Sequence, residues 1–201
     1  MNFRFDYWYT CVGIVGAPRT GKSYITAKLL GSASKRCSVL VADPKQKAAY
    51  TPYSDDIVVA KDTEYNGSKV DSFIEARKDT PVWCLGLDDL DYFVKHAKES
   101  RWLENLAIAS KGHWLQGCIW QSRRIKNLPY TLYQNSDYLI FTYGVDERDY
   151  DDLQEYAKLD IELYKTLPRP IYDPQDPNKI ISAKYLILNR QTKEQRILGL
   201  R

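Results

Sequence analysis

A short segment near the amino terminus combines two glycines, a lysine and a hydroxyl group in a spacing suited to holding phosphates. Residues 16–23 read GAPRTGKS and match the pattern G-x-x-x-x-G-K-[ST]. Glycines let backbone N–H groups curl around a phosphate at a helix N-terminus, where the helix dipole favours an anion. Lys22 can then bridge the β- and γ-phosphates of ATP, and Ser23 can ligate Mg²⁺. The predicted nucleotide contacts are Gly16, Ala17, Pro18, Arg19, Thr20, Gly21, Lys22, Ser23 and Tyr24.

Two adjacent carboxylates, Asp88 and Asp89, follow the apolar run PVWCLGL. Hydrolysis of ATP needs one carboxylate near the metal and another that orients or deprotonates the attacking water. An apolar strand that ends in two acids matches the Walker B pattern, with Asp88 in the metal shell and Asp89 polarising water. The alternative is that the two acids only cap the following helix. Together with the glycine-rich loop, the pair predicts a Mg-ATP site that transfers a phosphoryl group to water.

A third polar group, Gln121, ends another apolar run, QGCIW. An amide at a strand edge can sense the γ-phosphate and position water between neighbouring strands, although it can equally be an ordinary strand-end residue. Arg123 and Arg124 follow it. Arginines in this place can act on a nucleotide in a neighbouring protomer, contact DNA phosphates, or simply be solvated.

These side chains need a sheet whose strands end at a common edge. Short runs rich in Val, Ile, Leu and aromatic residues alternate with segments of helical period, which predicts an α/β fold with a mainly parallel central sheet flanked by helices. We expect strands at 11–15, 38–42, 56–60, 82–87, 115–120 and 137–142, and helices at 22–31, 69–78, 90–111, 127–135 and 147–158.

The proline-rich segment PRPIYDPQDP at 168–177 predicts an extended loop that ends this core. After it, ISAKYLILN and EQRILGL flank a polar turn and predict a C-terminal β-hairpin. We expect one P-loop ATPase domain over residues 1–201, with a core at about 10–167 and a C-terminal extension at about 168–201.

Composition narrows the class of protein. Apolar residues make up 44% and charged residues 27% of the 201 residues, which is globular usage, and a net charge of +3 does not by itself indicate nucleic acid. The four cysteines show no CxxC spacing, which argues against a zinc knuckle or a disulfide framework. No run approaches the ~20 apolar residues of a transmembrane segment. We therefore expect a protein of a reducing, cytoplasmic setting without a transmembrane segment of its own.

Taken in chain order, the segments IVGAPRTGKS, VLVADPK, PVWCLGLDD, GCIWQSRR and NSDYLIFTY resemble the core of the FtsK–HerA superfamily of DNA-translocating ATPases. The likeness spans roughly residues 10–158 and includes Asp43-Pro44-Lys45, which is similar to the D-P-K element of that superfamily. In its small size, the chain is most similar to the genome-packaging ATPases of membrane-containing double-jelly-roll viruses. The resemblance therefore implies a RecA-like P-loop fold and an ATP-dependent activity on DNA.

More specifically, the resemblance implies a motor that forms a hexameric or pentameric ring and moves viral double-stranded DNA into a preformed capsid. Its implied cofactors are ATP and Mg²⁺, and its implied partners are double-stranded DNA, further copies of the chain, and viral capsid or inner-membrane vertex proteins. The expected location is the host cytoplasm or the virion. The alternatives are a filamentous-phage-type assembly or conjugation ATPase, a nucleotide-gated interaction module, and a small-molecule kinase.

One segment departs from the family pattern. In many relatives an arginine finger stands shortly before the sensor glutamine, whereas this place holds Lys111-Gly112-His113. A lysine is a point charge and cannot make the bidentate contact of a guanidinium. Either Lys111 acts there as a charge, or the role belongs to Arg101, Arg123 or Arg124. The candidate DNA contacts are Lys95, Lys98 and Lys126.

Overall fold

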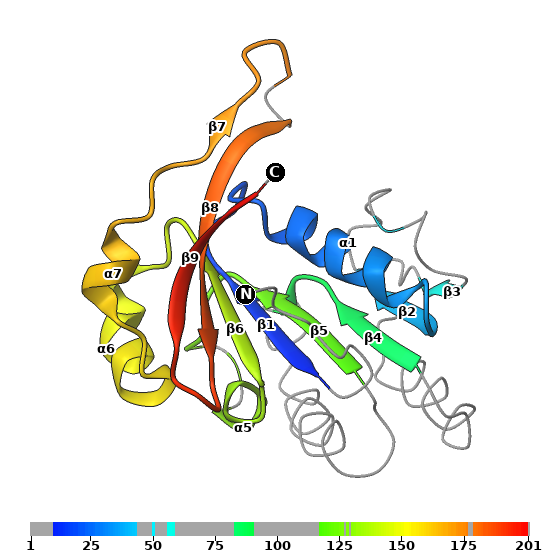
Figure 1. The fold of residues 1–201 in the computed structure, drawn as a ribbon, viewed down its shortest axis with the longest axis horizontal. Coiled ribbons are helices and arrows are strands. Elements are labelled where there is room, and N and C mark those ends of the chain that lie inside the picture. The colour runs from blue at the N-terminus through cyan, green and yellow to red at the C-terminus, as the bar shows by residue number, and fades with distance from the viewer. Residues whose placement is uncertain are drawn as a thin grey trace.

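Figure 1 shows the computed structural model, which describes residues 10–43, 50, 56–58, 83–90, 117–126, 128, 130–176 and 179–200. Within these ranges, the strands are β1 (Cys11–Val15), β2 (Ser38–Ala42), β3 (Asp56–Val58), β4 (Trp83–Leu87), β5 (Gly117–Ser122), β6 (Tyr138–Thr142), β7 (Ile171–Tyr172), β8 (Ile180–Asn189) and β9 (Gln195–Leu200). The described helices are α1 (Lys22–Ala33), α5 (Tyr130–Gln134), α6 (Tyr150–Asp152) and α7 (Ile161–Lys165), with the short turns η2 (Glu147–Asp149) and η3 (Leu153–Ala157).

The described strands form one sheet in the order β3-β2-β4-β5-β1-β6-β8-β7, with β9 paired to β8. The strands from β3 to β6 in this order run parallel, and β8 runs antiparallel to β6. Strand β1 therefore lies between β5 and β6. Parallel strands end at the same edge of the sheet, so the loops that follow β1, β4, β5 and β6 gather there.

Two apolar layers cover the sheet because alternate strand residues point to opposite faces. On one face, residues such as Val15, Leu85 and Trp120 pack with side chains from α5, η3 and α7. On the other face, Ile14 and Val41 pack against buried residues of α1. All five residues of β1 are buried, as expected for a strand covered on both sides.

Helix α1 begins where the glycine-rich loop ends. Gly21 precedes it in the left-handed region with φ 96°, a conformation that glycine adopts without the steric cost of a side chain. The buried face of α1 includes Ile25, Leu29 and Leu30, and the N–H of Ser34 donates to the Leu30 carbonyl at its end. This places the first turn of α1 at the carboxyl edge of the sheet.

The carboxyl-terminal strands extend past that edge. Strands β8 and β9 form the predicted antiparallel hairpin, and Tyr185 of β8 pairs with Thr142, the last residue of β6. Because β8 is antiparallel, residues 180–184 continue beyond the end of β6, and β7 pairs with them there. Strand β7 and the start of β8 thus form an arm above the carboxyl edge, seen in orange in Figure 1.

The α/β fold class with a mainly parallel sheet and a C-terminal hairpin is confirmed. Strands at 11–15 and 38–42 have the predicted bounds, and the other four predicted strands are found within a few residues. The helix predicted at 147–158 is a succession of η2, α6 and η3. The helices expected at 69–78 and at 90–111, except Leu90, lie outside the described residues. None of the described helices has the length and apolar character needed to cross a membrane.

Candidate nucleotide site

The loop between β1 and α1 is tied to the strands on both sides of β1. The N–H of Gly16 donates to the Ser122 carbonyl at the end of β5 (3.3 Å), and the N–H of Ala17 donates to the Tyr143 carbonyl just after β6 (3.3 Å). A Cβ atom at Gly16 would overlap the Thr142 side chain, so only glycine fits this close approach. The loop is therefore held as a cradle at the carboxyl edge of the sheet.

The polar side chains of the loop turn inward. Lys22 Nζ donates to the carbonyls of Gly16 and Ala17, both at 2.7 Å, which places the ammonium group across the loop. Thr20 Oγ1 donates to the Ala17 carbonyl (2.7 Å) and lies 2.6 Å from Thr142 Oγ1. Of the other predicted contacts in this segment, Pro18, Arg19 and Tyr24 are exposed. The cradle thus places the Lys22 ammonium and the first turn of α1 where a phosphate can bind.

The acidic pair lies directly after β4. Both residues are buried although both are carboxylates: Asp88 is 2% exposed and Asp89 is 8% exposed. Asp88 Oδ2 accepts a hydrogen bond from the Tyr50 hydroxyl (2.8 Å), and Gln121 Nε2 donates to Asp88 Oδ1. Asp89 pairs with Arg123, whose Nη2 lies 3.4 Å from Asp89 Oδ2. Buried carboxylates require such partners or a cation.

Gln121 links the acidic pair to the phosphate loop. It lies inside β5 and is 1% exposed, and its Nε2 also reaches the Tyr50 hydroxyl (3.0 Å) and Ser23 Oγ (3.5 Å). Its Oε1 is buried and has no hydrogen-bond partner within the described part of the chain. A buried oxygen without a partner is costly. Together with the glycine cradle, this oxygen fits a site completed by a nucleotide and its water.

These groups also fit a Mg²⁺ ion that binds together with phosphates. In such sites the protein supplies few of the metal ligands, and phosphates and water supply the rest. Ser23 offers a hydroxyl and Asp88 a carboxylate, and Gln121 contacts both. No group of three or more His, Cys, Asp or Glu residues within the described ranges forms an all-protein metal site. The donor set therefore suits a metal that arrives with ATP.

Tyr50 is a site residue that the sequence analysis missed. Its side chain is fully buried between Asp88 and Gln121. Burial and the nearby Asp88 carboxylate raise the pKa of the Tyr50 hydroxyl far above its usual value, so it stays a neutral donor. No spacing or periodicity marks Tyr50 in the sequence, because only tertiary packing brings it to Asp88.

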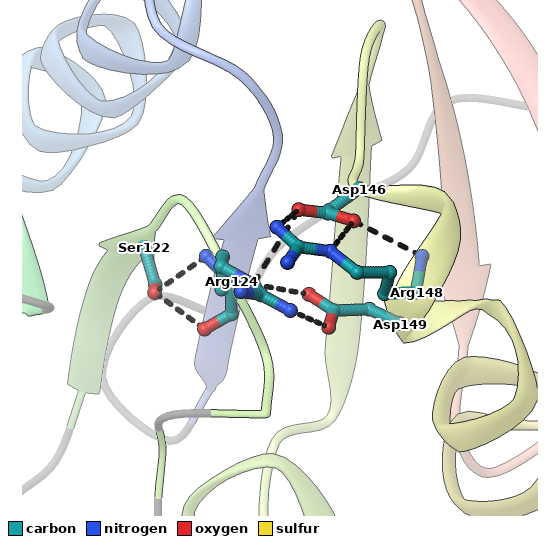
Figure 2. A network of polar contacts seen from close by, with 5 residues as sticks. All are labelled: Ser122, Arg124, Asp146, Arg148 and Asp149. Carbon is teal, nitrogen blue, oxygen red and sulfur yellow. Dashed lines mark hydrogen bonds and ion pairs between the residues drawn. The ribbon is translucent and has the colours of Figure 1, made fainter.

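The two adjacent arginines lie in different surroundings. Arg123 faces Asp89 and is about half exposed, whereas Arg124 turns away to the buried carboxylate of Asp149. Arg124 Nη2 and Nε donate to Asp149 at 2.6 and 3.1 Å, and Ser122 Oγ contacts the Arg124 backbone (Figure 2). The structure therefore brings Arg123, and not Arg124, to the acidic pair.

The remaining predicted residues fall into two groups. Lys126 is exposed in the turn after β5, and Asp43 is buried at the end of β2. The other named positions lie outside the described residues: Pro44, Lys45, Lys95, Lys98, Arg101 and Lys111. The finger and DNA-contact assignments stay predictions.

Strand β1, the glycine cradle and helix α1, which begins with Lys-Ser, follow one another in the chain. Strand β1 lies between parallel strands, and the acidic pair follows β4, the second strand from β1 in the sheet. This arrangement defines the fold of a P-loop NTPase. No protein-family model matches the sequence, and no curated protein sequence matches it.

Solved structures do match. The DNA-packaging ATPase B204 of Sulfolobus turreted icosahedral virus has a TM-score of 0.68 and 19% identity, over 95% of this chain and 97% of that chain. The genome-packaging NTPase B204 of Sulfolobus turreted icosahedral virus 2, in complex with ATP-gammaS, has a TM-score of 0.67 and 17% identity, over 96% of this chain and 98% of that chain. EssC (ATPases 2 and 3) of Geobacillus thermodenitrificans has a TM-score of 0.60 and 17% identity, over 94% of this chain and 39% of that chain. The predicted resemblance is confirmed as a likeness of fold.

Proposed function

We propose that this chain is an ATPase that uses the site at the carboxyl edge of its sheet to hydrolyse Mg-ATP. The observation that carries the proposal is that Gln121 of β5 contacts both Ser23, which follows Lys22 at the start of α1, and Asp88, which follows β4. Phosphoryl transfer is catalysed mainly by positioning and by electrostatic stabilisation, and these are the groups that such a reaction needs.

Each residue has a part that follows from its place. The backbone N–H groups of the cradle and the Lys22 ammonium bind the phosphates, and Ser23 and Asp88 would hold Mg²⁺. When bound, the metal neutralises charge on the transferring phosphoryl group. Asp89 holds and polarises the attacking water, and Gln121 orients it through the oxygen that has no partner among the described residues.

We further propose that hydrolysis drives double-stranded DNA into a preformed viral capsid, with the chain acting in a ring. The support is the likeness to two packaging enzymes over nearly the whole of both chains, together with the ordered motifs of the FtsK–HerA superfamily. Capsid or inner-membrane vertex proteins would be the remaining partners, in the host cytoplasm or on the virion.

An ATPase assay with and without duplex DNA tests both parts. Wild-type protein should hydrolyse ATP in the presence of Mg²⁺, and duplex DNA should raise the rate. Lys22→Ala removes the charge shared by the phosphates and should abolish turnover. Nucleotide binding without turnover in wild type would replace the enzyme with a nucleotide-gated interaction module.

The likeness to EssC and to the type VII secretion ATPase EccC of Thermomonospora curvata favours a second candidate, an ATPase of a secretion apparatus. This chain covers 39% and 25% of those two chains, which makes a whole-chain comparison with them weaker than with B204. If the protein hydrolyses ATP but does not bind duplex DNA, and duplex DNA does not raise the rate, this candidate is favoured over packaging.

A further inference from the structure

The site gives a bound nucleotide a direction along the sheet edge. The acidic pair and Gln121 lie on β4 and β5, to one side of the phosphate loop. The γ-phosphate must face these groups, because the metal and the attacking water act there. With the phosphates in the loop after β1, the sugar and base are directed away from β5, toward the β6 side.

An aromatic residue and an arginine meet on the β6 side. Tyr143 follows β6 directly, and its carbonyl accepts from the N–H of Ala17 in the phosphate loop. Arg169 Nε donates to the Tyr143 hydroxyl (2.9 Å), and the guanidinium carbon lies 5.7 Å from the centre of the Tyr143 ring. Tyr143 is half-buried and Arg169 is exposed. A flat π surface and a planar cation thus lie beside the cradle.

The arm formed by β7 and the start of β8 borders the same place. Arg169 lies between two prolines just before β7, which restricts the local backbone. Tyr172 of β7 is half-buried, and burial raises the pKa of its hydroxyl, a rise that the Arg19 charge of the phosphate loop partly offsets. The bond from Arg169 to Tyr143 ties the segment before the arm to the turn after β6, which is itself hydrogen-bonded to the phosphate loop.

We propose that Tyr143 and Arg169 form the subsite for the purine base of the nucleotide, with Tyr172 of the β7–β8 arm at its border. The proposal rests on the proposed ATPase function and adds where the base lies. Aromatic rings and guanidinium planes stack on nucleobases, and the planar arginine suits this better than a lysine does. Nothing in such stacking requires a particular purine.

Binding measurements with ATP and with inorganic triphosphate separate the base from the phosphates. Wild-type protein should bind ATP about tenfold more tightly than triphosphate, which corresponds to about 1.4 kcal/mol from stacking. Arg169→Ala and Tyr143→Leu should each remove most of this preference and leave triphosphate binding unchanged. Arg169→Lys should also lose the preference, because the charge remains but the planar group does not. Circular dichroism and the melting temperature show whether each variant folds.

Arg36→Ala is the matched control, since Arg36 is exposed beyond the far end of α1. It should bind both ligands as wild type does. Equal binding of ATP and triphosphate by wild type would overturn the subsite, and so would an Arg169→Ala variant that loses affinity for both. Loss of the preference in Tyr24→Ala alone would place the base over α1 instead. A wild-type protein that binds neither ligand would contradict the ATPase proposal itself.

Discussion

The guanidinium of Arg124 grips the carboxylate of Asp149 through two hydrogen bonds, and the Asp149 side chain is completely buried. This pair joins the turn after β5 to η2, the turn after β6 (Figure 2). The phosphate loop is hydrogen-bonded to Ser122 at the end of β5 and to Tyr143 just after β6. The Arg124–Asp149 pair therefore joins the two segments that hold the phosphate loop on either side. We therefore expect Arg124 to act on the stability of the edge and not on the nucleotide.

Asp149→Ala should lower the free energy of unfolding by about 2 kcal/mol, because Arg124 loses two charge-assisted hydrogen bonds and keeps the longer contact with Asp146. Urea denaturation measures the change. The control is Arg148→Ala, in which an arginine that is 74% exposed loses its bond to Asp146 at the cost of about 0.5 kcal/mol. Equal stability of the two variants would show that the Arg124 pair contributes no more than a surface ion pair.

Asp89→Asn should keep Mg-ATP binding and lose about 100-fold in kcat, since an amide cannot accept a proton from the attacking water. Binding is measured by calorimetry and turnover by phosphate release. The asparagine is nearly isosteric, and its contact with the half-exposed Arg123 contributes little to stability. Loss of binding together with turnover would assign Asp89 to the metal shell.

Much of this site could be predicted because its backbone is marked locally. Strand β1 is an unbroken apolar run, strand β2 is apolar after Ser38, and Gly21-Lys22-Ser23 marks where α1 begins. What the sequence did not predict depends on distant partners. Arg124 and Asp149 are 25 residues apart, and Tyr50 and Asp88 are 38 apart, so no periodicity links them. Strand β5 continues to Ser122, which places Gln121 inside the strand beside Asp88.

Alkaline pH should destabilise the fold through buried tyrosines. Burial raises the pKa of Tyr133 to about 12 and that of Tyr164 further. Because an unfolded tyrosine ionises at about pH 10, this contribution to stability is complete below that pH and is lost as the pH rises toward the folded values. Urea unfolding at about pH 9 and about pH 11 should show the loss.

Tyr164→Phe should make this loss smaller, because it removes one of the groups that titrate. The variant also starts from a lower stability, since the Tyr164 hydroxyl accepts from the Val145 N–H (2.7 Å) and donates to the Thr142 carbonyl (3.0 Å). The comparison is therefore the difference between the two pH values within each protein. An unchanged difference would show that Tyr164 is not a source of the alkaline loss.

Tyr50→Phe tests whether the buried hydroxyl positions the metal-site carboxylate. The substitution removes the bond to Asp88 Oδ2 and the acceptor for Gln121 Nε2, and keeps the ring that fills the space. Mutation of a group that orients a metal ligand typically lowers metal affinity or activity by about 10- to 100-fold. We expect the Mg²⁺ concentration for half-maximal ATPase activity to rise about tenfold, with a smaller change in the KM for Mg-ATP at saturating metal. Tyr133→Phe, which changes a tyrosine on α5, is the matched control and should leave the Mg²⁺ dependence unchanged. A Tyr50→Phe variant that loses stability but keeps the wild-type Mg²⁺ dependence would limit Tyr50 to packing, whereas a shifted dependence in a stably folded variant is what a positioning role for Asp88 requires.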